Sequence, residues 1–217
     1  MATKLSDCWQ TPKWLFDELN EEFSFDIDLC ATKENSKCLL FYRDYINNVL
    51  AEYYSDFDDW MFPVKSPKDV TCFMNPPYSN PKPFIEKAWE DSKHCKIVCL
   101  VKCDPSTRWW AAFWDYNKPV YCPEKRAHFD QMHRECSKCK GTCRYVYNGP
   151  KPGCEVRFFP KRIKFDPPQE LIDSRTIYLS GKEWYWKPVV NLFKPKKLSG
   201  PTFSSALVIM DRRNEIL

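Results

Sequence analysis

The sequence predicts an α/β fold in which helices cover both faces of a mostly parallel sheet. Segments with strand patterns alternate with segments of helical pattern along the chain, which is typical of layered α/β proteins. Residues 96–103, KIVCLVKC, form a continuous apolar run, as expected of a central parallel strand buried on both faces. With 217 residues, 43% of them hydrophobic, the chain can build one main core, with room for a small appended module.

The first predicted helix follows Thr11. Thr11 is expected to cap this helix and Pro12 to occupy its first position. The helix is expected to end near Asn20. Three apolar residues of this segment fall on one face: Leu15, Phe16 and Leu19.

The first predicted strand lies in FSFDIDLCA, residues 23–31, where apolar and polar residues alternate with a period of two. This pattern places Asp26 and Asp28 on the face opposite the apolar residues. The end of the strand, residues 28–31, is a candidate edge of a functional site. The apolar residues are Phe23, Phe25, Ile27 and Leu29.

The second predicted strand, Thr71–Met74, is followed by two prolines. Proline cannot donate to a sheet ladder, so the strand is expected to stop at Asn75 and the next residues to stay stiff and extended. Further predicted elements are a helix over 83–92, a strand over 119–122, two short strands over 155–165 about Pro160, and a last strand over 204–210.

The composition excludes several function classes. Only five glycines occur, and no G-x-G-x-x-G or Walker-type phosphate loop is present, which disfavours dinucleotide oxidoreductases and nucleoside triphosphatases. No apolar run is long enough to span a membrane and no signal peptide is evident, so we expect a cytoplasmic protein. Basic residues gather in 158–165 and 192–200, where they can meet a phosphate backbone or form a solvated face.

A cysteine-rich insert, residues 122–154, predicts a metal site. The pattern H-x2-C-x2-C-x3-C has the spacing at which neighbouring thiolates converge on one tetrahedral ion. Four such ligands leave no open position, so the sequence predicts a structural zinc. The pattern comprises His133, Cys136, Cys139 and Cys143, and the other candidates for the fourth ligand are His128, Cys122 and Cys154.

The segment Asn75-Pro76-Pro77-Tyr78 is a candidate catalytic site. An exocyclic base amine is a poor nucleophile, because its lone pair is delocalised into the ring. Hydrogen bonds from the amine to the Asn75 side-chain oxygen and the Pro76 carbonyl favour a pyramidal nitrogen. Tyr78 is then expected to stack on the base, which must leave the duplex to be reached. An amide, a bare carbonyl and a ring are what methylation of a flipped base requires.

The chain resembles the phage-type DNA N6-adenine methyltransferase family. The similarity lies in the D-x-W-x-T-P opening of residues 7–31, in MNPPYSNPKPFIEKAWE and in VCLVKCDPSTRWW. It continues in VRFFPKRIKF and in GPTFSSALVIM, and it covers most of the chain outside the insert. The resemblance implies a Rossmann-like class I methyltransferase sheet in residues 1–121 and 155–217, although the F-x-G-x-G loop of the wider pattern is missing.

The resemblance also implies residue roles. The methyl donor would be S-adenosylmethionine, and the substrate double-stranded DNA with a flipped target base. The residues implied to bind the donor are Trp9, Thr11, Pro12, Asp28, Cys30, Ala31, Asn75 and Asp58 or its neighbour Asp56. A monomer is the default expectation.

Three alternatives stay open. The same site geometry serves the exocyclic amine of cytosine, which makes an N4-cytosine methyltransferase the nearest rival. The second alternative is a non-catalytic zinc-containing nucleic-acid-binding protein, but such a protein does not require an intact Asn-Pro-Pro-Tyr turn. A metal-dependent nuclease using Asp56, Asp58 and Asp59 lacks a convincing downstream E-x-K.

Overall fold

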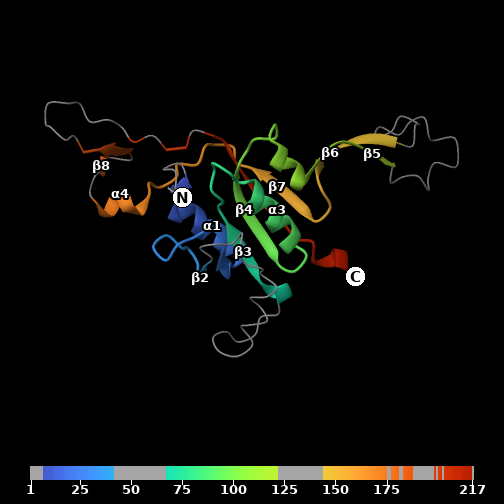
Figure 1. Cartoon of the computed structure of the whole chain (residues 1–217), viewed down its shortest axis with the longest axis horizontal. Coiled ribbons are helices and arrows are strands. Elements are labelled where there is room, and N and C mark those ends of the chain that lie inside the picture. The colour runs from blue at the N-terminus through green and yellow to red at the C-terminus, as the bar shows by residue number, and fades with distance from the viewer. Residues whose placement is uncertain are drawn as a thin grey trace.

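The structure is a computed structural model. It describes residues 7–41, 67–121, 144–174, 177–180, 183–187, 198, 200–201 and 203–216. Its centre is a six-stranded sheet of order β2-β1-β3-β4-β10-β7, with helices on both faces (Figure 1). The strands are β1 (Ile27–Asp28), β2 (Leu40–Phe41), β3 (Thr71–Met74), β4 (Lys96–Lys102), β7 (Cys154–Phe158) and β10 (Ser205–Met210). The predicted mixed α/β architecture is therefore confirmed.

The direction of the strands creates a switch point in the sheet. β1 is parallel to β2 on one side and to β3 on the other, and β3 is parallel to β4. From β1 the chain first moves outward to β2 and then returns to β3 on the other side of β1. Crevices at the carboxyl ends of strands that flank such a reversal are where open α/β sheets bind ligands. β10 is antiparallel to both of its neighbours, β4 and β7.

The strands β3 and β4 form the middle of the core. All four residues of β3 are buried, as are the five central residues of β4. This burial on both faces explains the continuous apolar runs in the sequence. Thr71–Met74 has the predicted bounds, and β4 ends one residue before the predicted 103.

Helix α1 (Lys13–Phe23) covers one face of the sheet. Its three predicted apolar residues are buried against β3, β4 and β10: Leu15, Phe16 and Leu19. The predicted cap and end are wrong. Pro12 occupies the N-cap, and its carbonyl accepts from the backbone N–H groups of Leu15 and Phe16. The Thr11 side chain instead contacts another segment. The helix continues to Phe23 and ends at the C-cap Ser24, whose backbone is left-handed with φ 54°. The Asn20 carbonyl accepts the N–H of Ser24, and the Asn20 side chain accepts that of Phe25.

The predicted strand over residues 23–31 is also corrected. Phe23 ends α1, and only Ile27 and Asp28 form a strand. Both residues are buried, so Asp28 does not lie on a polar face. The reason is that Asp28 is in register with Phe73, whose side chain lies in the core layer beneath α1, so this face of the strand is covered as well.

The second face is covered by helix α3 (Lys82–Asp91) and the 3-10 helix η3 (Arg108–Ala112). The first of these matches the predicted helix over 83–92. Ile85 of α3 and Trp110 of η3 are fully buried against the strands, together with Phe113. The thiols of Cys72, Cys95 and Cys99 are buried in this layer, as expected of core cysteines, whereas Cys103 is half-buried.

Strands β5 (Trp114–Tyr121) and β6 (Arg144–Pro150) form an antiparallel ribbon that extends away from the sheet (Figure 1). β5 begins five residues before the predicted 119. The segment 155–165 contains one strand, β7, and not two. Its second half leaves the sheet because Ile163 and Phe165 are buried in the core layer beneath α1.

The remaining elements are short. They are η2 (Pro67–Asp69), α4 (Gln169–Asp173), η6 (Arg213–Ile216) and a hairpin of β8 (Ile177–Ser180) with β9 (Glu183–Trp186). Within the described ranges, no helix is long and apolar enough to cross a bilayer.

Candidate active site

The candidate site lies where the carboxyl ends of β1 and β3 meet. Ile27 is the register partner of Cys72 and Asp28 that of Phe73, and the N–H of Leu29 donates to the Phe73 carbonyl at 2.8 Å. The segments that follow the two strands, from Leu29 and from Asn75 onward, therefore leave the sheet at the same edge. This is the carboxyl edge of the sheet at its switch point.

The Asn75 side chain is held at both ends of its amide. Its Nδ2 donates to Thr11 Oγ1 at 3.1 Å, and its Oδ1 accepts from the Tyr78 hydroxyl at 2.8 Å. Thr11 is only 3% exposed, and Asn75 is half-buried. The amide thus has a defined orientation, and Oδ1 keeps a second lone pair for another donor.

The Tyr78 ring packs edge-on against two aromatic residues. The ring centroids lie 5.6 Å from Phe165 and 4.6 Å from Phe203, with interplanar angles of 75° and 67°. Burial raises the pKa of Tyr78 far above its usual value, although the hydrogen bond to Asn75 opposes this shift. The hydroxyl therefore stays protonated and acts as a donor.

The rest of the turn is fixed by a second contact with the N-terminal segment. The Asp7 carboxylate accepts from the Ser79 backbone N–H at 2.8 Å and from the Ser79 hydroxyl at 2.6 Å. Pro76 is buried and Pro77 is half-buried between these two anchored ends. The predicted catalytic residues Asn75–Tyr78 thus form one ordered turn.

Asp28 is a buried carboxyl group beside this turn. It is 4% exposed and accepts the backbone N–H groups of Cys30 at 3.3 Å and of Lys37 at 3.2 Å. Desolvation by burial raises its pKa to about 6, while the two backbone hydrogen bonds and the Lys37 charge lower it. A carboxylate held in this way is a favourable partner for a cationic ligand.

Other predicted residues surround the same edge. Ala31 is buried and Cys30 is half-buried, and burial raises the pKa of the Cys30 thiol, which keeps it neutral. Trp9 is buried against Gly200, where an added Cβ would lie 3.2 Å from the indole ring. Trp9 belongs to the core layer that also holds Phe165.

Several predicted residues lie outside the described ranges. These are Asp56, Asp58, Cys122, His128, His133, Cys136, Cys139 and Cys143. Of the candidate zinc ligands only Cys154 is described, at the start of β7. In the part of the chain that the structure describes, no group of three or more His, Cys, Asp or Glu side chains is arranged to hold a metal ion.

Sequence reasoning missed four residues of the site: Asp7, Ser79, Phe165 and Phe203. Asp7 opens the D-x-W-x-T-P pattern, and Ser79 directly follows the Asn-Pro-Pro-Tyr turn, so their motifs gave a signal that was not used. The two phenylalanines lie in the segments 156–165 and 200–210, which have no periodicity that points to the turn.

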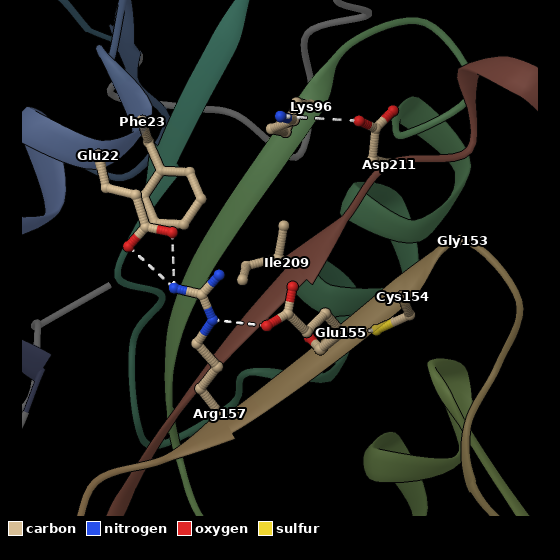
Figure 2. Close-up of a pocket in the computed structure, with 9 residues that line it drawn as sticks. All are labelled: Glu22, Phe23, Lys96, Gly153, Cys154, Glu155, Arg157, Ile209 and Asp211. Carbon is tan, nitrogen blue, oxygen red and sulfur yellow. Dashed lines mark hydrogen bonds and ion pairs between the residues drawn. The ribbon is translucent and has the colours of Figure 1, made fainter.

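A pocket of about 480 Å³ lies at the opposite end of the sheet (Figure 2). It opens between the end of α1 and the strands β4, β10 and β7. Its charged side chains pair with one another: Arg157 bonds to Glu22 at 2.7 Å and to Glu155 at 2.6 Å, and Lys96 lies 3.8 Å from Asp211. Of the predicted site residues, the pocket contains only Cys154, a candidate zinc ligand, and none of those predicted to act in catalysis or to bind the methyl donor. The turn at the carboxyl edge therefore remains the candidate site.

The chain is similar to one protein family and to two phage proteins. A family model described as DNA N-6-adenine-methyltransferase (Dam) matches residues 1–141. A DNA N-6-adenine-methyltransferase of Haemophilus phage HP1 is 35% identical over 108 residues, which cover 48% of this chain and 54% of the relative. A DNA N-6-adenine-methyltransferase of Escherichia phage T1 is 31% identical over 106 residues, which cover 48% of this chain and 39% of that relative.

The chain spans about half the length of the first of these curated relatives and less of the second. No solved structure matches it. The family model covers well over half of the chain and includes every described residue of the turn and of the segment that anchors it. The chain therefore belongs to the DNA N-6-adenine-methyltransferase (Dam) family.

Proposed function

We propose that the protein is a site-specific DNA methyltransferase that transfers a methyl group from S-adenosylmethionine to the exocyclic N6 amine of adenine. Family membership and the names of the phage relatives support the reaction. The observation that carries the proposal is the Asn75 amide, whose oxygen is fixed at the carboxyl end of β3.

The Asn75 oxygen can accept the target amine without losing its existing contact. A carbonyl oxygen has two lone pairs, and the Tyr78 hydroxyl occupies one of them. A second N–H of the amine would donate to the Pro76 carbonyl. These two bonds draw the amine toward a pyramidal geometry, in which the nitrogen lone pair is available for attack. Asn75 and Pro76 thereby hold and orient the nucleophile.

The Tyr78 ring is the proposed stacking surface for the base. The ring is half-buried, and its contacts with Phe165 and Phe203 hold it in place. A base inside a duplex cannot reach this turn, so the adenine must be flipped out of double-stranded DNA. Stacking on an aromatic ring offsets part of the cost of unstacking in the duplex.

The residues at the carboxyl edge fit a cationic methyl donor. S-adenosylmethionine supplies a methyl group on a positively charged sulfonium. The raised pKa of Asp28 means that its ionised form lacks full charge compensation, which a bound cation would provide. We infer that Asp28 holds this cation, and that Cys30, Ala31, Trp9 and Pro12 line the same pocket.

Three further residues are proposed for the donor. Asp58, or its neighbour Asp56, is assigned to the adenosine part because an acidic stretch precedes the catalytic strand. The backbone of Thr11 and the Asn75 side chain complete the proposed donor pocket, since both lie at the meeting point of β1 and β3.

We also infer a Rossmann-like class I methyltransferase sheet over 1–121 and 155–217. The support is the switch point between β1 and β3 and the single strand, β10, that runs against the other five. The insert 122–154 is proposed to bind a structural zinc through His133, Cys136, Cys139 and Cys143. The spacing of these ligands supports this, and the described part of the insert contributes β6 and the start of β7.

The test is direct measurement of the methylated base. DNA incubated with the purified protein and S-adenosylmethionine is digested to nucleosides and examined by mass spectrometry, with the Asn75→Ala variant as the matched control. N6-methyladenine from the wild type alone is the expected result. If N4-methylcytosine is found instead, the target base is cytosine and not adenine. If neither sample contains a methylated nucleoside, the proposal is overturned.

A further inference from the structure

We propose that Thr11 is a positioning residue for Asn75, and that residues 7–11 act as a strap that fixes the catalytic turn. This inference rests on the proposed function, because it assigns a role within the same site. The strap residues lie 64 positions or more before the turn residues that they contact. The roles implied for this segment by the resemblance concern the methyl donor and not the Asn75 amide.

The first support is the Thr11 hydroxyl. Thr11 lies one residue before the N-cap of α1, which is Pro12, and α1 has no side-chain cap bond. The Thr11 Oγ1 atom accepts from Asn75 Nδ2 at 3.1 Å instead, and the side chain is 3% exposed. The buried Thr11 hydroxyl therefore contacts the Asn75 amide and not the end of the helix.

The second support is that the strap holds both ends of the turn. Thr11 contacts Asn75 at the first residue of the turn, and Asp7 contacts Ser79 at its last with two short bonds. The 75–79 turn is thereby anchored at both ends to one five-residue segment.

The third support is that the strap is itself tied to the body of the protein. Gln10 forms a β-bridge with Asp166, with both backbone N–H···O distances at 2.9 Å. Trp9 packs on Gly200 and is 9% exposed. A segment fixed by main-chain bonds and a buried indole can impose its geometry on a neighbouring turn.

The effect of losing the Thr11 contact depends on how freely the terminal torsion of the Asn75 side chain rotates. The terminal torsion of asparagine is broad, so a side chain with one partner samples a range of orientations. Losing the Thr11 acceptor leaves only the Tyr78 hydroxyl to hold the amide. Small misplacements of a reacting group can reduce a rate by about 100-fold. We expect Thr11→Val to slow methyl transfer by about 10- to 100-fold.

The experiment separates positioning from donor binding. Single-turnover methylation rates at saturating S-adenosylmethionine are compared for wild type, Thr11→Val and Thr11→Ser, and donor dissociation constants are measured separately. We expect the Val variant to be slow with donor affinity within about twofold of wild type, and the Ser variant, which retains the acceptor, to recover most of the rate. Asp17→Asn, in an exposed ion pair on α1, is the matched control and should leave both quantities unchanged.

Two outcomes overturn the inference. One is a wild-type rate in Thr11→Val. The other is a loss of donor affinity by the same factor as the rate, which would place the Thr11 hydroxyl in the donor pocket. A second measurement does not depend on activity: the side-chain amide resonance of Asn75 in the 15N-labelled protein should shift in Thr11→Val and return in Thr11→Ser. If the Asn75 resonance shifts in Thr11→Val but the wild-type protein methylates no DNA, the proposed function is wrong, whereas the contact between Thr11 and Asn75 is confirmed.

Discussion

At the scale of single residues, Asn75 carries the proposed chemistry through an oxygen that no other described residue of the turn can replace. Asn75→Ala removes the acceptor but no core packing, because the side chain is only half-buried. We expect methyl transfer to fall by about 100-fold or more, in line with the loss of one preorganised polar group in an enzyme site. The rate is to be measured together with the unfolding midpoint and donor affinity. Turnover close to wild type would remove Asn75 from the catalytic assignment.

Tyr78 has two separable contributions, its ring and its hydroxyl. From the sequence alone Tyr78→Phe is expected to be tolerated, but the hydroxyl donates to Asn75. One net hydrogen bond is worth about 0.5–1.5 kcal/mol, so we expect a loss of roughly 2- to 10-fold for Phe. Tyr78→Ala also loses stacking, worth about 1–3 kcal/mol. Rates for the two variants on one DNA substrate are the measurement, and equal rates would assign the whole effect to the hydroxyl.

The burial of Asp28 makes the free energy of unfolding depend on pH, because burial raises the pKa of this carboxyl group. Its folded pKa of about 6 lies above its usual value of 3.8, so the folded state binds the proton more tightly than the unfolded chain. The contribution of this tighter proton binding to the free energy of unfolding is fully present below pH 3.8. It is lost as the pH rises through about 6. The shift corresponds to about 3 kcal/mol.

We expect the wild-type free energy of unfolding to fall by up to this amount, relative to Asp28→Asn, between pH 4 and pH 7. The asparagine variant is the reference because it does not titrate. Urea unfolding of both proteins without methyl donor is the measurement. Parallel pH profiles of the two proteins would show that Asp28 titrates near its usual value.

At the scale of elements, α1 shows how one face of a helix attaches to the sheet while the other meets solvent. Leu15 is 1% exposed among the side chains of β3, β4 and β10, whereas its neighbour Trp14 is 57% exposed. Leu15→Ala is expected to lower the free energy of unfolding by about 2–5 kcal/mol, because it leaves a cavity in a packed core. Trp14→Ala is the adjacent control and should change it by less than about 0.5 kcal/mol. Urea unfolding of both variants checks this, and equal losses would contradict the packing of α1.

At the scale of the whole molecule, the cysteine-rich insert is joined to the sheet through β5, β6 and β7. We expect one zinc ion per chain, bound in the insert, with no part in methyl transfer because four protein ligands leave no position for water. Removal of zinc by a strong chelator should unfold the insert locally, since a short polar segment cannot order itself through apolar burial. The resulting loss of DNA affinity should exceed any loss of donor affinity.

Elemental analysis and titrations with DNA and with the methyl donor test this prediction. A variant with Cys136→Ser and Cys139→Ser gives the matched comparison, because it removes two proposed ligands and leaves the sheet unchanged. A protein that contains no zinc as purified, or one whose DNA affinity and stability are the same with and without zinc, would contradict it.

The sequence by itself determined the elements whose pattern reflects local burial. The strands Thr71–Met74 and 204–210, the buried face of α1 and the Asn-Pro-Pro-Tyr turn all follow from short-range periodicity and from the backbone limits of proline. The family resemblance followed from several motifs in order, among which Asn75–Tyr78 is specific only in combination with the D-x-W-x-T-P opening.

Only the tertiary structure decided which groups complete the site. Thr11 contacts Asn75 across 64 positions and Asp7 contacts Ser79 across 72, and no local pattern encodes such distances. The alternation around Asp28 suggested a polar face, but α1 covers the face on which its register partner Phe73 lies. The half of segment 155–165 expected as a strand instead places Phe165 against Tyr78. In each case the path of the chain through the core overrides the local preference, because burial of apolar surface depends on neighbours that are distant in sequence.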